Sequence, residues 1–256
     1  MKLKNPSLLD PEVPIEGYPD LIYPREEQMK KLNEKLKLFK ENGFISASLI
    51  FGPPGSGKTT IVRYVLYEFF KKLGNENYKL IYVPCSSFPT PFGVLKKIYY
   101  DLATPEDLEK KPDMWQIGIA EILKKNDWNV LVVIDEVDRP IKSGGIYRDF
   151  FLHTLFRLPE VTGKANLSVM LITNVFNIRK YLKEDVRDFL MPGEDITFPY
   201  YNAQDLFEIL KRRAKFVLEE GTYELEDLAW IASKIIDIGG EAQKGNARHA
   251  IMALKY

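Results

Sequence analysis

Cysteine is almost absent from this sequence. Cys85 is the single cysteine, so the chain has no disulfide framework, and the reducing cytoplasm is the expected compartment. Cys85 follows an apolar run, a position that favours a buried thiol over a nucleophile. No apolar stretch approaches the ~20 residues that a membrane-spanning helix needs, and the N-terminus lacks a signal-peptide core. We therefore expect a soluble protein with no membrane partner.

An excess of charge of one sign is also lacking, because 36 Lys and Arg residues balance 36 Asp and Glu residues. Bulk charge therefore gives no sign of a nucleic-acid partner, although a local basic patch would leave the total unchanged. The 256 residues, 45% of them hydrophobic and 28% charged, have the composition of an ordinary globular protein. This length allows one large domain or two smaller ones.

A glycine-rich loop follows the apolar run at residues 49–51. Gly52, Gly57, Lys58 and Thr59 have the spacing of the P-loop, G-x-x-x-x-G-K-[ST], and an apolar helical pattern follows them. Glycines let backbone N–H groups approach a phosphate, and the N-terminus of the helix adds partial positive charge. Lys58 would contact the β- and γ-phosphates, and the Thr59 hydroxyl would hold Mg²⁺. The predicted nucleotide contacts in this loop are Gly52, Pro53, Pro54, Gly55, Ser56, Gly57, Lys58, Thr59 and Thr60.

Short apolar runs alternate with amphipathic segments as far as Pro199. Strands are expected at 45–51, 79–83, 129–135, 167–173 and 195–198, and helices at 25–42, 58–73, 90–102 and 115–123. This alternation predicts an α/β fold with a parallel five-stranded sheet between helices. Beyond Pro199 only helical patterns follow, at 203–219, 225–238 and 246–254. We predict an extended, proline-rich arm at 1–24, an ATPase core at 25–199 and a small all-helical lid at 200–256.

Polar residues end two of the buried strands. Asp135 and Glu136 follow the run 129–134, at the end of a parallel sheet where ligands bind. Asp135 would hold the Mg²⁺ hydration shell, and Glu136 would act as general base toward the attacking water. A water-activating carboxylate favours hydrolysis over transfer to a small substrate. Asn174 ends the next strand, where its amide would reach the γ-phosphate or the water; a turn-forming asparagine is the alternative.

These motifs together resemble the AAA+ ATPase family, in which a P-loop core precedes a helical lid. Gly245-Asn246-Ala247-Arg248 is similar to that family's second sensor, G-x-A-R. Within AAA+ proteins, the chain resembles the archaeal origin-recognition and helicase-loading initiators. The similar segments are Pro24-Arg25-Glu26-Glu27-Gln28, Phe198-Pro199-Tyr200-Tyr201 and the helical insertion before Asp135, within a resemblance that covers roughly residues 8–256.

The resemblance implies further site residues. Arg25 would line the base pocket, and Arg248 would approach the γ-phosphate and couple the angle of the lid to the nucleotide state. Arg187 is the first candidate, and Arg179 the second, for the arginine offered to a neighbouring subunit's nucleotide. The expected cofactors are therefore ATP or ADP with Mg²⁺, and ATP-dependent self-association is an expected property.

Two features depart from the family's pattern. Initiators usually carry an asparagine after the second strand that modulates the catalytic glutamate, and this chain has Pro84 there. They also continue into a winged-helix DNA-binding domain, whereas this sequence ends at Tyr256, in the expected lid. Either the sequence is truncated or the natural protein lacks that domain.

Three hypotheses about function remain open at this point. The first is an ATP-driven switch in DNA replication initiation or helicase loading, which would bind double-stranded DNA with weak sequence selectivity and a protein partner such as a helicase or another initiator. DNA contacts would come from the insertion around Trp115, flanked by Lys110, Lys111, Lys124 and Lys125, and from the turn 142–145. The second is a protein-remodelling or adaptor ATPase with no DNA role. The third is a scaffold that holds nucleotide without turnover.

Overall fold

The computed structural model describes residues 4–10, 13, 18–110, 112–164, 166–190, 193–238 and 245–255, without the side chains of Lys110 and Ile238. Lys111, one of the lysines expected to flank Trp115, and the last residue, Tyr256, lie outside the described residues. The chain divides into two compact units. We call residues 31–51 and 69–196 the sheet unit and residues 1–30, 52–68 and 197–256 the lid unit. Each unit is described separately, and the predicted domain boundaries stay predictions.

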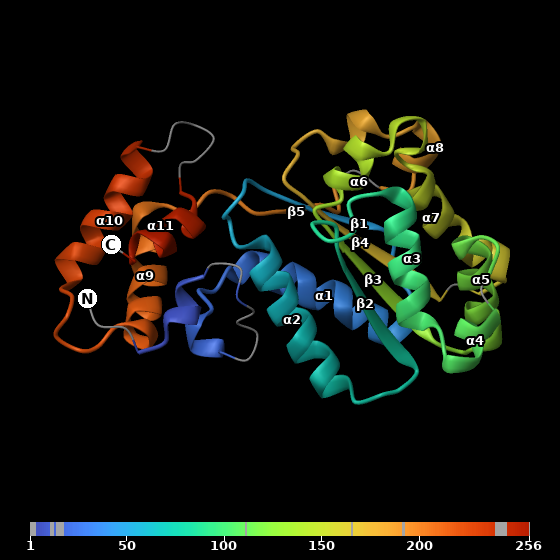
Figure 1. The fold of residues 1–256 in the computed structure, drawn as a ribbon, viewed down its shortest axis with the longest axis horizontal. Coiled ribbons are helices and arrows are strands. Elements are labelled where there is room, and N and C mark those ends of the chain that lie inside the picture. The colour runs from blue at the N-terminus through green and yellow to red at the C-terminus, as the bar shows by residue number, and fades with distance from the viewer. Residues whose placement is uncertain are drawn as a thin grey trace. The chain divides into compact units, whose positions relative to one another are not determined.

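Five strands form one sheet (Figure 1). The strands are β1 (Ser48–Phe51), β2 (Tyr78–Pro84), β3 (Asn129–Asp135), β4 (Leu167–Thr173) and β5 (Ile196–Thr197), in the spatial order β2-β3-β4-β1-β5. The pairs β2–β3, β3–β4 and β4–β1 are parallel. All of β4, and β3 after its first residue, are buried, as expected for strands covered on both faces. The predicted α/β fold with a parallel five-stranded sheet is confirmed.

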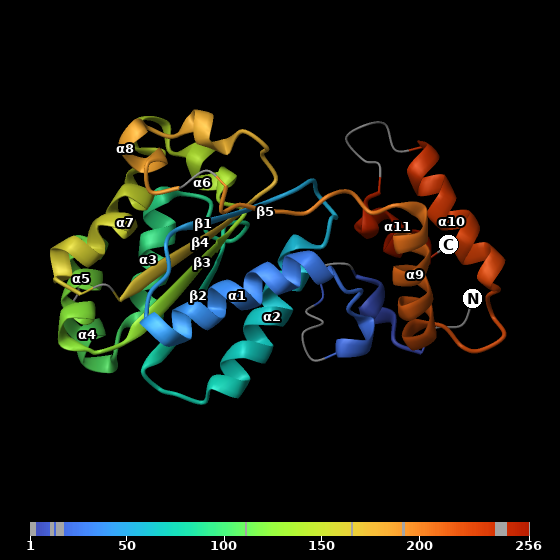
Figure 2. The same cartoon turned by 180° about the vertical axis from the view of Figure 1, so that it is seen from behind.

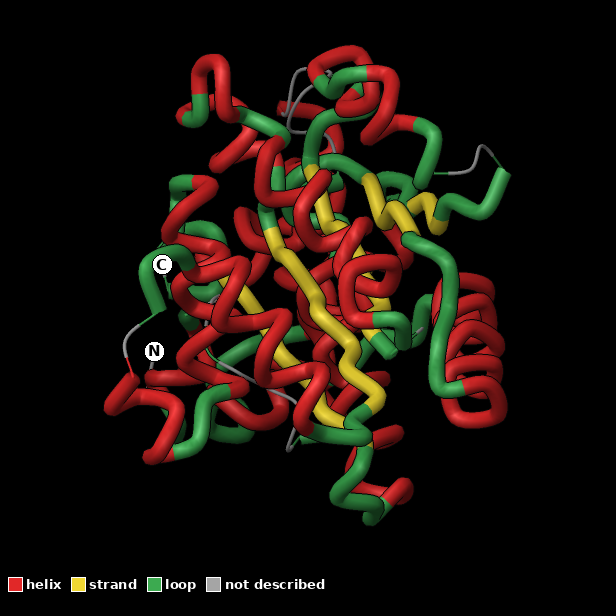
Figure 3. The backbone as a smooth tube through the Cα atoms, turned by 90° about the vertical axis from the view of Figure 1, so that its right-hand side faces the viewer, coloured by secondary structure: helices red, strands yellow, loops and turns green. Residues whose placement is uncertain are grey.

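Figure 3 shows the strands in yellow. Their register aligns the carboxyl ends of four strands at one edge of the sheet. Asp135 pairs with Pro84 on β2 and with Ile172 on β4, while Phe51 at the end of β1 pairs with Thr173. Residues that directly follow these positions therefore emerge at the same edge. This is the edge at which ligands bind in open α/β sheets.

Helices of the sheet unit surround a large apolar core. Helices α3 (Pro91–Leu102), α5 (Trp115–Lys125) and α7 (Phe150–Thr162) pack on one another, and α7 also packs on β4. The short helices are α4 (Pro105–Lys110), α6 (Asp138–Ser143) and α8 (Glu184–Arg187), with 3₁₀ turns η3 (Gly145–Tyr147) and η4 (Ile178–Tyr181). Two long helices, α1 (Glu26–Asn42) and α2 (Lys58–Leu73), run from one unit into the other along the chain.

The lid unit contains three packed helices, α9 (Ala203–Val217), α10 (Leu225–Ile238) and α11 (Ala247–Ala253) (Figure 2). Helix α9 begins with a capping box, in which the side chains of Asn202 and Asp205 each accept a hydrogen bond from the other's backbone N–H. Two 3₁₀ turns of the N-terminal arm, η1 (Pro6–Leu9) and η2 (Pro19–Leu21), pack on α9. The arm thus contains short helical turns where an extended chain is expected from sequence, because proline is tolerated at the first position of a turn.

No helix in the described ranges is long and apolar enough to cross a membrane.

We predict that Cys85 does not react in the folded protein. Its side chain is fully buried, and burial, followed by the nearby carboxylates of Asp135, Glu136 and Asp138, raises the pKa of the thiol well above its usual range. An aromatic disulfide reagent at pH 8 should give no measurable release of thiolate from the native protein and full reaction after unfolding in guanidinium. Rapid labelling of the native protein would contradict the burial of this residue.

Candidate nucleotide site

The glycine-rich loop has the backbone conformation that only glycine adopts without cost. Gly55 and Gly57 have φ angles of 72° and 86°, in the left-handed region. Helix α2 begins at Lys58, directly after these glycines, while Thr59 and Thr60 are half-buried in its first turn. The loop and the helix start therefore have the local form of a phosphate-binding site.

The Lys58 ammonium group is held within the loop. Its Nζ donates to the carbonyl oxygens of Gly52 at 2.7 Å and Pro53 at 2.8 Å, with the Ser56 hydroxyl at 3.4 Å. The residue is only 6% exposed. A buried cation within hydrogen-bond distance of the loop's own carbonyl oxygens is a suitable partner for an anionic phosphate.

Lid residues lie against the loop, within the lid unit. The backbone N–H of Ala247 donates to the carbonyl oxygen of Gly55 at 3.1 Å. A Cβ atom added to Gly55 would be 1.9 Å from Asn246 Oδ1, and one added to Gly57 would be 2.3 Å from Tyr201 Oη. The glycines thus permit both the turn of the loop and the close approach of the lid.

Arg25 also contacts the loop and the start of the lid. Its guanidinium lies 3.7 Å from the centre of the Tyr201 ring, and its Nη2 donates to Pro199 O at 2.7 Å and Ser56 O at 3.3 Å. Burial raises the pKa of the Tyr201 hydroxyl, and the positive charge of Arg25 opposes this shift. Arg25 therefore stabilises the junction between loop and lid; its contact with a base stays a prediction.

In the sheet unit, two acidic residues follow β3 with different partners. Asp135 is 6% exposed, and its Oδ2 accepts a hydrogen bond of 2.6 Å from the Tyr82 hydroxyl. Glu136 has a φ angle of 57°, and its Oε2 accepts a hydrogen bond of 2.5 Å from Arg139 Nε. The two neighbouring carboxylates therefore accept hydrogen bonds from different donors.

Asp138 connects the start of α6 to the end of β4. Its Oδ1 accepts from the Thr173 hydroxyl at 3.0 Å and from the Asn174 backbone N–H at 3.4 Å, and Lys142 lies 3.3 Å from its Oδ2. These bonds connect the backbone segments that contain Glu136 and Asn174. The contact of the half-buried Asn174 amide with a phosphate or water stays a prediction.

The two arginine candidates have different environments. Arg179 makes two 2.7 Å hydrogen bonds to the two carboxylate oxygens of Asp195, which raise the pKa of the Arg179 guanidinium. Arg187, at the end of α8, is exposed. The structure thus uses Arg179 to connect two loops, and Arg187 is the better placed of the two to reach another molecule.

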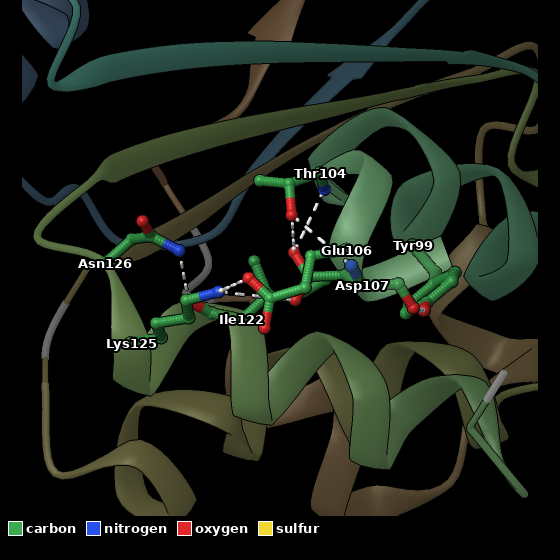
Figure 4. Close-up of polar contacts among 7 residues, drawn as sticks. All are labelled: Tyr99, Thr104, Glu106, Asp107, Ile122, Lys125 and Asn126. Carbon is green, nitrogen blue, oxygen red and sulfur yellow. Dashed lines mark hydrogen bonds and ion pairs between the residues drawn. The ribbon is translucent and has the colours of Figure 1, made fainter. Parts of the chain in front are cut away.

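The helical insertion forms a closed polar cluster (Figure 4). Lys125 Nζ lies 3.5 Å from Glu106 and 3.7 Å from Asp107, and Asp107 also accepts hydrogen bonds from the backbone and hydroxyl of Thr104. Trp115 is half-buried, 5.4 Å from the ring of Tyr99. Of the four lysines predicted to flank Trp115, Lys125 is therefore neutralised by carboxylates.

The predicted site residues leave out several side chains that make contacts at the strand ends of the sheet unit or against the P-loop of the lid unit. They are Tyr82, which binds Asp135; Asp138 and Arg139 on α6; and Tyr201 and Asn246, which contact the P-loop glycines. Asp138 and Arg139 lie two and three residues after Glu136, so the local sequence could have drawn attention to them. The partners of Tyr82 and Tyr201 lie far away in sequence, and no periodic pattern identifies them. In the described part of the chain, no group of three or more His, Cys, Asp or Glu residues forms a metal cluster.

A parallel sheet with a P-loop after one strand and an Asp-Glu pair after another is typical of a P-loop nucleotide-binding domain. Residues 46–182, more than half of the chain, match the AAA domain family, and the chain belongs to this family. Its sequence is similar to the archaeal initiators. ORC1-type DNA replication protein 1 of Sulfurisphaera tokodaii is 29% identical over 98% of this chain, and protein 3 of that organism is 31% identical over 94%.

The resemblance to archaeal replication initiators is thus confirmed. The chain spans about three fifths of these relatives, 60% and 62% of their lengths. The fold also matches the Aeropyrum pernix ORC1 protein, solved in complex with DNA, with a TM-score of 0.80 and 24% identity over 97% of this chain and 62% of that one. The Aeropyrum pernix ORC2 protein, solved with ADPNP and ADP, gives a TM-score of 0.78 at 24% identity over 99% of this chain and 66% of that one.

We predict that Gly57→Ala destabilises the protein more than a glycine substitution with similar strain. Gly221, also in the lid unit, has a φ angle of 79° with no atom within 4 Å of an added Cβ, so Gly221→Ala pays only the strain of about 1–2 kcal/mol. Gly57→Ala adds the collision with Tyr201 Oη, about 1–3 kcal/mol more. Urea unfolding without nucleotide measures both values.

The double variant Gly57→Ala/Tyr201→Phe removes the oxygen that the new methyl group meets. The double variant should therefore recover part of the stability that Gly57→Ala loses through the collision. A double-mutant cycle measures this recovery as the coupling energy between positions 57 and 201. Equal destabilisation by Gly57→Ala and Gly221→Ala, with no coupling to Tyr201, would contradict the loop–lid contact.

Proposed function

We propose that this protein is an ATP-binding and ATP-hydrolysing switch that acts in DNA replication initiation or helicase loading through nucleotide-dependent binding of DNA or a protein partner. One observation carries the proposal: lid residues touch the backbone of the phosphate-binding loop, through the Ala247 hydrogen bond and the Tyr201 and Asn246 contacts. A ligand that rearranges this loop has a direct route to the lid. The similarity to ORC1-type replication proteins supplies the biological setting.

In the proposed mechanism, the loop from Gly52 to Thr60 holds the phosphates of ATP. Lys58 exchanges carbonyl partners for phosphate oxygens, which strengthens its hydrogen bonds because the new acceptors are charged. Mg²⁺ would be held by the Thr59 hydroxyl and, through water, by Asp135. An alcohol oxygen and a single carboxylate suit this ion, which keeps several waters and binds substrate phosphates.

Hydrolysis in this proposal depends on residues at the strand ends. Glu136 accepts a proton from the attacking water, and Asn174 orients that water or the γ-phosphate. Arg248, half-buried in the first turn of α11, reads the γ-phosphate from the lid. The exposed Arg187 would complete the site of a neighbouring copy, so isolated protein should turn over slowly and self-association should depend on ATP.

Double-stranded DNA and a protein such as a helicase or another initiator are the proposed partners. The Aeropyrum pernix relative was solved in complex with DNA, which supports DNA as a ligand of this fold family. On this chain, the last turn of α6 contains Lys142, whose side chain is 61% exposed although it pairs with Asp138. Such contacts would give salt-sensitive binding with weak sequence selectivity.

A second candidate function is a protein-remodelling or adaptor ATPase without a DNA role. The balanced charge of 36 basic and 36 acidic residues favours it, as do the carboxylate partners of Lys125 and Lys142. This second function predicts that the protein self-assembles with ATP. It also predicts that a protein partner stimulates ATP hydrolysis and that DNA does not change the rate.

Two substitutions should separate ATP binding from hydrolysis. Glu136→Gln should keep ATP affinity and slow hydrolysis by about 10²–10⁴-fold, because it removes the base and no phosphate contact. Lys58→Ala should weaken ATP binding by roughly 10- to 100-fold, because it removes a charged hydrogen-bond donor. Fluorescent-nucleotide binding and release of labelled phosphate measure the two quantities. Lys72→Ala, an exposed lysine near the end of α2, is the control that should change neither.

Titration of labelled duplex DNA with ATP, ADP or no nucleotide tests the partner. We expect tighter binding in one nucleotide state, with an affinity that falls as salt rises by a slope of about −0.9 per phosphate contacted. Lack of binding in every state at low salt would contradict the DNA role and leave the adaptor function. Failure to bind ATP at all would contradict both.

A further inference from the structure

Glu136 has an unusual backbone conformation. It is the only non-glycine residue with a positive φ angle in the described ranges, at 57°. This conformation costs about 1–2 kcal/mol relative to the usual helical or extended regions, so the surroundings must hold it. The backbone N–H of Arg139 donates to Glu136 O at 2.9 Å, which fixes the turn before α6.

The Glu136 side chain is also fixed by Arg139. The guanidinium Nε donates to Oε2 at 2.5 Å, and the two side chains are 51% and 23% exposed for Arg139 and Glu136. A general base uses a carboxylate lone pair to accept the proton of the attacking water. Here the donor of Arg139 occupies a lone pair of Oε2, so the carboxylate is oriented toward the arginine.

No other side chain in the described part of the chain hydrogen-bonds to this carboxylate. Pro84, which ends β2 beside Asp135, offers neither a side-chain donor nor an N–H. Tyr82 binds Asp135, and Lys142 binds Asp138. Arg139 is thus the single described partner that controls the direction of the Glu136 carboxylate.

We propose that Arg139 is a positioning residue that holds Glu136 in a resting pair and limits basal ATP hydrolysis. This inference rests on the proposed role of Glu136 as the base. In the hydrolytic step, the water oxygen bonds to the γ-phosphorus, the bond from that phosphorus to the bridging oxygen breaks, ADP leaves, and the water proton passes to Glu136. Glu136 performs this step after its carboxylate leaves Arg139, whose exposed side chain can turn into solvent.

Arg139→Ala should raise kcat without changing KM for ATP. Pairs of this exposure are weak, so the expected rise is about two- to fivefold, equivalent to about 0.4–1 kcal/mol at 1.36 kcal/mol per tenfold. Arg139→Lys, which keeps a charge but loses the planar guanidinium, should fall between the parent and Arg139→Ala. Steady-state hydrolysis over a range of ATP concentrations measures kcat and KM, and thermal unfolding verifies that each variant is folded.

Arg157→Ala is the matched control, because Arg157 and Glu160 form an exposed pair of the same i,i+3 spacing on α7 at 3.0 Å. It should leave the rate unchanged. Salt supplies a second readout that a purely structural role would not move. Rising ionic strength screens the pair, so the parental rate should approach that of Arg139→Ala, whose own rate should not rise.

An unchanged or lower rate in folded Arg139→Ala, or an equal salt response in parent and variant, would overturn the proposal. Glu136→Gln distinguishes this failure from failure of the proposed function. If Glu136→Gln is inactive while Arg139→Ala hydrolyses ATP at the parental rate, only the role of Arg139 is wrong. If Glu136→Gln hydrolyses ATP at the parental rate, the base itself is wrongly assigned.

Discussion

The close backbone approach between the phosphate-binding loop and the lid is the constraint on which the account depends. Gly55 and Gly57 must be glycine for two separate reasons: their φ angles are positive, and Asn246 and Tyr201 occupy the space of a side chain. The same loop that would bind a phosphate is therefore also the surface against which the lid residues pack. Arg25 strengthens this junction by stacking on Tyr201. This shared surface is the basis of the nucleotide-dependent switch that we propose.

The strand-end edge of the sheet unit poses a different physical problem, because it gathers Asp135, Glu136 and Asp138 within one turn of chain. Like charges so close repel one another unless each has its own donor. Tyr82, Arg139 and Lys142 supply these donors, and Thr173 adds a second bond to Asp138. The arrangement gives the carboxylates different surroundings: Asp135 is buried beside a phenol, whereas Glu136 is partly exposed and is bound by an exposed arginine.

Local patterns in the sequence predict the sheet and the loop, because a β-branched run such as 129–134 and the spacing from Gly52 to Thr59 carry their own signal. Helices α4, α6 and α8 span only 4–6 residues, too few for periodicity, and were not predicted. The turns of the arm depend on packing against α9. The contact between Tyr82 and Asp135 joins residues 53 positions apart. Such contacts arise from the strand register, which no single-sequence pattern determines.

The most direct test of the central claim is hydrogen–deuterium exchange of the lid peptides that contain Tyr201 and Ala247. Exchange would be compared without nucleotide, with ADP and with a non-hydrolysable ATP analogue. If the loop and lid share one surface, exchange at the Ala247 amide, which donates to Gly55 O, should differ between ADP and the ATP analogue, while the buried amides of β4 stay unchanged. Identical exchange of the lid peptides in all three states, at nucleotide concentrations that saturate the protein, would contradict the account.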